Sequence, residues 1–126
     1  MTVSFRLPTR VALWLLDHQR LGKTAGAKRI AGRLLKQPAL EGEVVAQSRL
    51  GQLLCCECET QRDRRIGLQL LRLAARAGDC QAQLELGRLH CRPNHYEPGQ
   101  ARHWLQAAAT RGSKEARQLL KALPAR

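Results

Sequence analysis

The spacing of apolar positions predicts helices in the second half of the chain. Ala82, Leu86 and Leu89 fall on one face at helical spacing. The segment 101–108 places apolar side chains on one face in the same way, at Ala101, Trp104, Leu105 and Ala108. Between these segments lies the stretch 92–99, whose two prolines exclude a continuous helix. The pattern therefore predicts a helix, a loop and a second helix.

This arrangement recurs along the chain. The segments 46–51 and 82–87 share the pattern Ala-Gln-x-x-Leu-Gly and begin 36 residues apart. The segments 74–78 and 108–112 share the pattern Ala-Ala-x-x-Gly and begin 34 residues apart. We therefore predict about three helix-pair repeats followed by a closing helix. The repeats span about 12–45, 46–81 and 82–115, and the closing helix spans 116–123 and ends before Pro124.

A glycine closes each predicted pair, and an alanine follows it four residues later. The glycines are Gly42, Gly78 and Gly112, and the alanines are Ala46, Ala82 and Ala116. Glycine after an alanine-rich helix suits a left-handed C-cap that turns the chain into the next helix. The small residues at fixed places let neighbouring helices approach closely, so we expect the larger leucine and tryptophan side chains to fill the space between repeats.

Composition favours an all-α fold. The chain has 126 residues, a usual size for one domain, and 44% of them are hydrophobic. Aromatic residues make up only 3%, so leucine and alanine must build the core, and both favour helices. We predict one domain over residues 1–126, in which antiparallel helix pairs stack into a solenoid.

The quoted residues resemble the Sel-one-like repeat family, which is related to the tetratricopeptide repeats. The resemblance rests on the two Ala-Gln-x-x-Leu-Gly segments and the two Ala-Ala-x-x-Gly closures. An acidic residue also stands four positions before the small residue of the second helix, as Asp63 does before Gly67. Glu97 stands in the same way before Ala101, and Trp104 occupies a position where the family prefers an aromatic. The resemblance covers about residues 12–122, with the first repeat the weakest.

The resemblance implies a right-handed α-α superhelix that acts as an adaptor in bacterial protein complexes, with partners along its concave face. The sequence also departs from the family pattern. The segment 56–62 replaces a glycine-rich inner loop, and Leu54 and His90 replace a tyrosine. The family's usual ligand preference therefore does not carry over to this chain.

The formal net charge is +12, and it is unevenly distributed. Residues 1–36 hold eight basic and one acidic residue, and residues 60–126 hold thirteen basic and five acidic residues. Such a field attracts acidic partners, although an arginine-rich surface also serves solubility alone. We predict a non-catalytic protein-binding module whose partner offers an acidic segment.

Polar positions on the first helices of the second and third repeats are the predicted partner contacts. These positions are Arg49, Gln52, Glu85 and Arg88. The alternative is that these side chains only solvate their helices.

The five cysteines form an odd set, three of them in one Cys-Cys-x-Cys run. They are Cys55, Cys56, Cys58, Cys80 and Cys91. Secreted disulfide scaffolds usually carry an even set, so a reducing, cytoplasmic compartment is predicted. Cys55 and Cys58 could join Cys91, His90 or His95 in a zinc site. No second Cys-x-x-Cys is present, so small buried hydrophobic side chains are the preferred interpretation, with no metal site.

The only apolar stretch near the N-terminus, Val11–Leu16, is six residues long. It is too short for a signal-peptide core or a membrane span. We predict that it is a buried helix face.

No catalytic or cofactor-binding residues are predicted. The four histidines are scattered along the chain. No Ser-His-Asp set and no pair of acidic residues occurs at a spacing typical of a catalytic site. The segment 22–24 ends like a phosphate-binding loop but lacks the preceding glycines, so it is predicted to be an ordinary loop.

Nucleic-acid binding is the main alternative function. Arg62, Arg64 and Arg65 are close together in the sequence. Four more basic residues, between positions 28 and 36, lie along one predicted helix. The aromatic residues that stack single-stranded bases are not interleaved with them. A membrane-surface role of the basic N-terminal segment is a further alternative.

Overall fold

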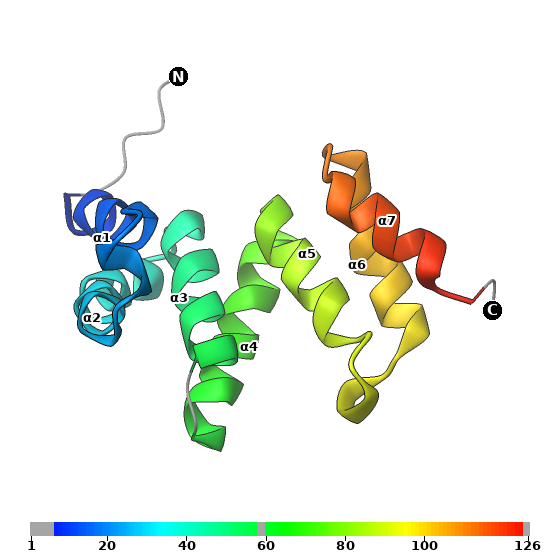
Figure 1. Cartoon of the computed structure of the whole chain (residues 1–126), viewed down its shortest axis with the longest axis horizontal. Helices are drawn as coiled ribbons and strands as arrows, with labels where there is room; N and C mark the ends of the chain where they lie inside the picture. The colour runs from blue at the N-terminus through cyan, green and yellow to red at the C-terminus, as the bar shows by residue number, and fades with distance from the viewer. Residues whose placement is uncertain (1–6, 58–59, 125–126) are drawn as a thin grey trace. The chain divides into compact units, whose positions relative to one another are not determined.

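The computed structural model describes residues 7–57 and 60–124, and this part of the chain is helical without strands (Figure 1). The prediction of an all-α fold is confirmed. The α-helices are α1 (Leu7–Asp17), α2 (Ala25–Leu40), α3 (Val44–Glu57), α4 (Gln61–Arg76), α5 (Cys80–Leu89), α6 (Pro98–Thr110) and α7 (Lys114–Ala122). Two short 3-10 turns, η1 (Leu21–Lys23) and η2 (Pro93–His95), lie between helices.

The helices form two compact units, Met1–Leu70 and Leu71–Arg126. The boundary between the units falls inside α4, so this helix contributes its first part to one unit and its last part to the other. The predicted division into three repeats, the superhelix and its hand stay predictions.

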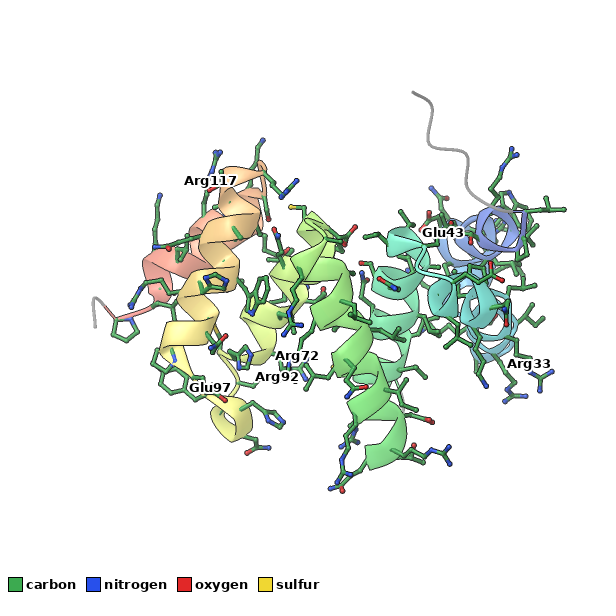
Figure 2. All side chains as sticks on the ribbon, turned by 180° about the vertical axis from the view of Figure 1, so that it is seen from behind. Arg33, Glu43, Arg72, Arg92, Glu97 and Arg117 are labelled. Carbon is green, nitrogen blue, oxygen red and sulfur yellow. The ribbon has the colours of Figure 1, made fainter. Side chains whose placement is uncertain are left out.

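The core of the N-terminal unit consists of small residues and leucines from α1, α2 and α3. It contains Ala12, Ala31, Leu35, Ala39, Ala46 and Leu50. Glu43, labelled in Figure 2, precedes α3, and its Oε2 accepts a hydrogen bond from the buried Thr9 Oγ1 of α1 at 3.0 Å. This bond joins the first helix to the start of the third.

The core of the C-terminal unit repeats this composition. It contains Leu84, Ala101, Leu105, Ala108 and Ala116. Gly87 of α5 lies directly against Leu105 of α6, since a Cβ at Gly87 would be 2.5 Å from Leu105 Cδ2. The predicted role of small residues in close helix approach is therefore confirmed at this contact.

The same turn ends α2, α4 and α6. Gly42, Gly78 and Gly112 have φ angles of 93°, 100° and 104°, in the left-handed region. The residue after each glycine donates its N–H to a carbonyl five residues back, for example Asp79 N to Ala74 O at 3.0 Å. This is the Schellman arrangement, which satisfies carbonyls at a helix end. The predicted left-handed C-caps are confirmed.

The glutamine of the Ala-Gln-x-x-Leu-Gly pattern also has a repeated contact. Gln47 Nε2 donates to Ala39 O at 3.2 Å, and Gln83 Nε2 donates to Ala75 O at 3.1 Å. Both glutamines are buried, and each bond crosses from one helix to the last turn of the preceding helix. The pattern therefore reflects a structural hydrogen bond.

Several predicted boundaries differ from the structure by a few residues. Helices α3 and α5 begin two residues before Ala46 and Ala82, and the closing helix predicted at 116–123 is α7, Lys114–Ala122. Pro98 begins α6 instead of lying in the loop, because the first helical turn does not need the N–H that proline lacks.

The prediction that the stretch Val11–Leu16 is a buried helix face is wrong for two of its residues. Ala12 is fully buried, but Val11 is 40% exposed and Trp14 is 60% exposed. Val11 and Trp14 lie one and two positions away from Ala12, and the rotation of about 100° per residue turns their side chains away from the face that Ala12 buries. Consequently α1 buries Ala12 against its unit and leaves a second apolar stripe uncovered.

Candidate partner-binding site

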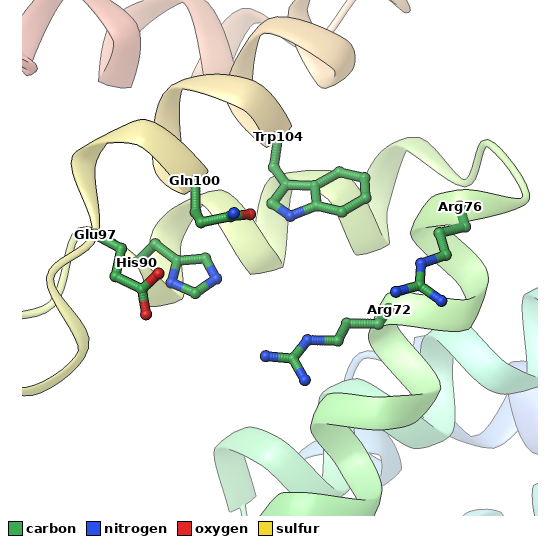
Figure 3. A pocket seen from close by; sticks show the side chains of 6 residues that line it. All are labelled: Arg72, Arg76, His90, Glu97, Gln100 and Trp104. Atoms are coloured by element: carbon green, nitrogen blue, oxygen red, sulfur yellow. The ribbon is translucent and has the colours of Figure 1, made fainter.

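A hollow of about 270 Å³ lies in the C-terminal unit (Figure 3). Its lining comes from the last turns of α4, the end of α5 and the first half of α6. The lining residues are Arg72, Arg76, His90, Glu97, Gln100 and Trp104. Nearly all of these side chains are polar, so the hollow suits a charged, hydrogen-bonding ligand.

Arg72 and Arg76 stand one helical turn apart on α4, so both side chains emerge from the same face. Both are exposed, and both extend toward the hollow in Figure 3. Among the described residues, neither guanidinium has a hydrogen-bond or ion-pair partner. The pair therefore offers two unneutralised, planar donors to a ligand.

His90 forms part of the wall. It is the C-cap residue of α5 and is only 7% exposed. Its backbone is fully used, because its N–H donates to Leu86 O and its carbonyl accepts from Glu97 N at 3.0 Å. Its ring Nδ1 is buried and has no hydrogen-bond partner among the residues that the structure describes. A buried polar atom of this kind costs free energy until a ligand or water satisfies it.

Trp104 and Gln100 come from the same face of α6, one turn apart. The neighbouring residues on the helix, Ala101 and Leu105, are fully buried in the core. This packing fixes the rotation of α6 and leaves the indole half-buried at the edge of the hollow. The His103 ring meets the indole edge-on, with ring centroids 4.8 Å apart.

The hollow has a negative and a positive end, because the Glu97 carboxylate and the two arginines line it at different places. Figure 3 shows Glu97 and His90 at one end and the two arginines at the other. A ligand that places an anionic group against Arg72 and Arg76 would therefore keep that group away from the carboxylate. The arrangement can bind and orient a ligand.

The first two predicted contact residues lie on α3 in the N-terminal unit. Arg49 is half-buried, and its Nη2 forms an ion pair with Asp17 Oδ1 at 2.8 Å. Gln52 is also half-buried and donates to Ser48 Oγ at 3.3 Å. Both side chains are thus occupied within their own unit.

The other two predicted contact residues lie on α5 and also have internal partners. Arg88 Nη1 bonds to Glu85 Oε1 at 2.9 Å, and Arg88 Nη2 pairs with Glu115 of α7. The ion pair with Glu115 links α5 to α7. Neither Glu85 nor Arg88 lines the hollow. The four predicted contacts therefore stay a prediction for a surface other than the hollow.

Sequence reasoning did not identify Arg72, Arg76, His90 or Gln100 as site residues. From the sequence, His90 is identified only as the replacement of a family tyrosine and as one possible zinc ligand. The available signal was the spacing of the two arginines, because arginines four residues apart on a helix share a face. Only the packing of α5 and α6 brings Trp104 and His90 opposite that face.

The cysteines show no disulfide or metal centre in the described part of the chain. Cys55, Cys80 and Cys91 are half-buried and form no disulfide within the described residues, and Cys58 lies outside them. No group of three His, Cys, Asp or Glu side chains within residues 7–57 and 60–124 could hold a metal ion. Burial raises the pKa of the Cys91 thiol.

No known protein family matches the sequence, and no curated protein matches it either. The Sel-one-like resemblance therefore rests on the quoted residues and stays a prediction. None of the described helices combines the length and the apolar character that crossing a membrane requires.

Proposed function

We propose that this chain is a non-catalytic protein-binding module that holds an acidic segment of a partner in the hollow of its C-terminal unit. The observation that carries the proposal is the pair of guanidiniums, Arg72 and Arg76, which has no acidic partner within residues 7–57 and 60–124 and lines the hollow together with Trp104. Arginine and tryptophan are the side chains most enriched among those that dominate protein interfaces.

The chemistry of the hollow fits a carboxylate. A guanidinium presents paired N–H donors that match the two oxygens of a carboxylate, and two of them one turn apart can hold two acidic side chains or one from both sides. Trp104 supplies an apolar surface beside the charges, so that water is displaced from the ion pairs. The Gln100 amide can form hydrogen bonds with polar groups of the bound backbone.

The recurring turns support the adaptor function implied by the Sel-one-like resemblance. The same Schellman turn and the same glutamine contact return at equivalent positions of the sequence pattern. Helical repeat proteins commonly use such scaffolds to present binding surfaces. The proposed function is therefore that of an adaptor, with the hollow as its anchoring point.

Nucleic acid is the alternative ligand, since guanidiniums bind phosphates and an indole can stack on a base. Glu97 argues against it, because a phosphate backbone passing through the hollow would meet this carboxylate. A protein segment can place an acidic side chain at the arginines and a neutral or basic group at Glu97. We therefore favour the protein ligand.

Fluorescence anisotropy with two labelled probes tests the proposal. One probe is a glutamate-rich peptide and the other is a single-stranded oligonucleotide. Replacing Arg72→Gln together with Arg76→Gln should weaken peptide binding at least about tenfold, because each charged hydrogen bond contributes about 1.5–3 kcal/mol. The matched control is Arg62→Gln with Arg65→Gln, which removes two exposed arginines from the same helix outside the hollow.

Equal losses in the two double variants would contradict the proposal, since they would show that net charge alone drives binding. Tighter binding of the oligonucleotide, with a steep dependence on salt, would favour the nucleic-acid function. If only the double variant Arg49→Glu with Arg88→Glu loses peptide binding, the binding site is instead the surface predicted from the sequence, which contains Arg49, Gln52, Glu85 and Arg88.

A further inference from the structure

The N-terminal unit carries most of the large apolar side chains that are exposed in the described residues. Six of the nine lie between residues 7 and 40, namely Leu7, Val11, Trp14, Leu21, Ile30 and Leu40. Leu7, Val11 and Trp14 follow one another on α1 at helical spacing, so they form one stripe. Their exposed fractions are 70%, 40% and 60%, so this stripe is separate from the buried contact that Ala12 makes.

Exposed cationic side chains are also concentrated in this part of the unit. Six exposed basic residues lie in the same part of the unit, Arg10, Arg20, Lys23, Arg29, Arg33 and Lys36. Arg33 extends away from α2 in Figure 2. The exposed acidic side chain of α1, Asp17, is neutralised by its ion pair with Arg49. The α1 stripe is therefore apolar, contains a tryptophan and belongs to a part of the unit with an excess of exposed positive charge.

We propose that the α1 stripe docks on an anionic phospholipid surface. Leucine, valine and tryptophan side chains can enter the boundary between headgroups and acyl chains while the helix lies in the plane of the surface. Tryptophan favours this boundary because its ring is apolar and its N–H is polar. The anionic headgroups supply the charge that complements Arg10, which is next to Val11 on α1, and the other exposed cations of this part of the unit.

Other occupants fit the stripe less well. A second copy of the chain would bring two positively charged surfaces together, and their repulsion opposes association. A nucleic acid would pair with the cations but would leave Leu7 and Val11 in water. An anionic bilayer matches both the charge and the apolar side chains. This inference does not depend on the function proposed for the hollow.

The test uses the intrinsic fluorescence of Trp14. The chain has two tryptophans, so Trp104→Phe leaves Trp14 as the only tryptophan. This protein is mixed with vesicles of phosphatidylcholine containing about 30% phosphatidylserine, and with vesicles of phosphatidylcholine alone. We expect co-sedimentation with the anionic vesicles and a blue shift of the Trp14 emission, both reduced by salt.

A double variant, Leu7→Ser with Val11→Ser in the same background, should bind the anionic vesicles about tenfold more weakly. Both side chains are exposed, and circular dichroism verifies that the helices are retained. The control is Ile66→Ser, which removes an apolar side chain that is 41% exposed on α4 and should not change binding.

Three results would overturn the proposal. The first is vesicle binding that the double variant leaves unchanged, and the second is binding without a shift of the Trp14 emission. The third is the absence of vesicle binding. In that case, a dimer in ultracentrifugation that the double variant dissociates would show that a second copy of the chain covers the stripe.

Discussion

At the residue scale, Gly67 shows how the absence of one methyl group determines helix packing. A Cβ at this position of α4 would lie 2.6 Å from the backbone nitrogen of Cys55 and 2.9 Å from the carbonyl oxygen of Gly51, both on α3. Backbone atoms cannot move aside as a flexible side chain can. The two helices can therefore approach this closely only because residue 67 is glycine.

We predict that Gly67→Ala lowers the free energy of unfolding by about 1–3 kcal/mol, because the added methyl group forces α3 and α4 apart. Gly32→Ala is the matched control within another helix of the same unit, where a Cβ would meet no atom within 4 Å. It should raise stability by about 0.5–1 kcal/mol, since alanine favours the helix. Urea denaturation followed by circular dichroism measures both, and equal effects would contradict the packing argument.

The two buried glutamines differ in one respect. Gln47 and Gln83 each donate to a carbonyl of the preceding helix, but the Oε1 of Gln83 is buried without a partner. Gln47→Ala should therefore cost about 1–2 kcal/mol of unfolding free energy. Gln83→Ala should cost less, because it also removes an unsatisfied buried oxygen. Denaturant titration of both variants provides the comparison, and the reverse order would be inconsistent with these contacts.

The raised pKa of Cys91 has a consequence for its reactivity. The thiolate is the nucleophile, and burial makes it scarcer in the folded protein than in the unfolded chain at the same pH. Alkylation of Cys91 by iodoacetamide at about pH 8 should therefore be slower in the folded state. The difference should narrow as the pH rises through the folded pKa. Peptide mapping by mass spectrometry follows the rate, and equal rates in both states would refute the expectation.

At the element scale, the local sequence at the helix ends determines the turns. Gly42, Gly78 and Gly112 all adopt positive φ, which L side chains rarely tolerate. Asp79 and Ser113 then cap the following helices, since their side chains accept hydrogen bonds from Ala82 N and Ala116 N. A helix end and the next helix start are thus encoded in two adjacent residues.

Gly112→Ala isolates the conformational cost of this turn. A Cβ at Gly112 would meet no atom within 4 Å, so only the backbone strain at φ 104° remains. The expected loss is about 1–2 kcal/mol of unfolding free energy. Gly99→Ala is a control, because it also meets no atom within 4 Å and has no positive φ. Thermal denaturation should show a lower Tm for Gly112→Ala alone, and an unchanged Tm would contradict the argument.

At the scale of the whole molecule, the sequence predicts what depends on local rules. Helical periodicity and the glycine spacing predict the all-α class and the three turns, because both arise from residues close in the chain. The Ala-Gln pattern predicts repeats, but it does not predict the bond from each glutamine to the preceding helix.

The hollow could not be predicted in the same way. Its walls come from α4, the end of α5 and α6, and their side chains meet only after Ala101 and Leu105 pack into the core. The exposed stripe on α1 was missed for a similar reason. A short apolar run does not show which of its side chains face the core, and the structure buries Ala12 but exposes Trp14.

The most direct test of the acidic-segment site uses Trp104 as its reporter. In Trp14→Phe protein, Trp104 is the only tryptophan and lies at the edge of the hollow. Titration with the unlabelled glutamate-rich peptide should change its emission in a saturable manner, because the bound segment excludes water from the indole. The added pair Arg72→Gln and Arg76→Gln should abolish this change, whereas Arg62→Gln with Arg65→Gln should preserve it. A peptide that binds by anisotropy without altering Trp104 emission would show that the acidic segment is held elsewhere.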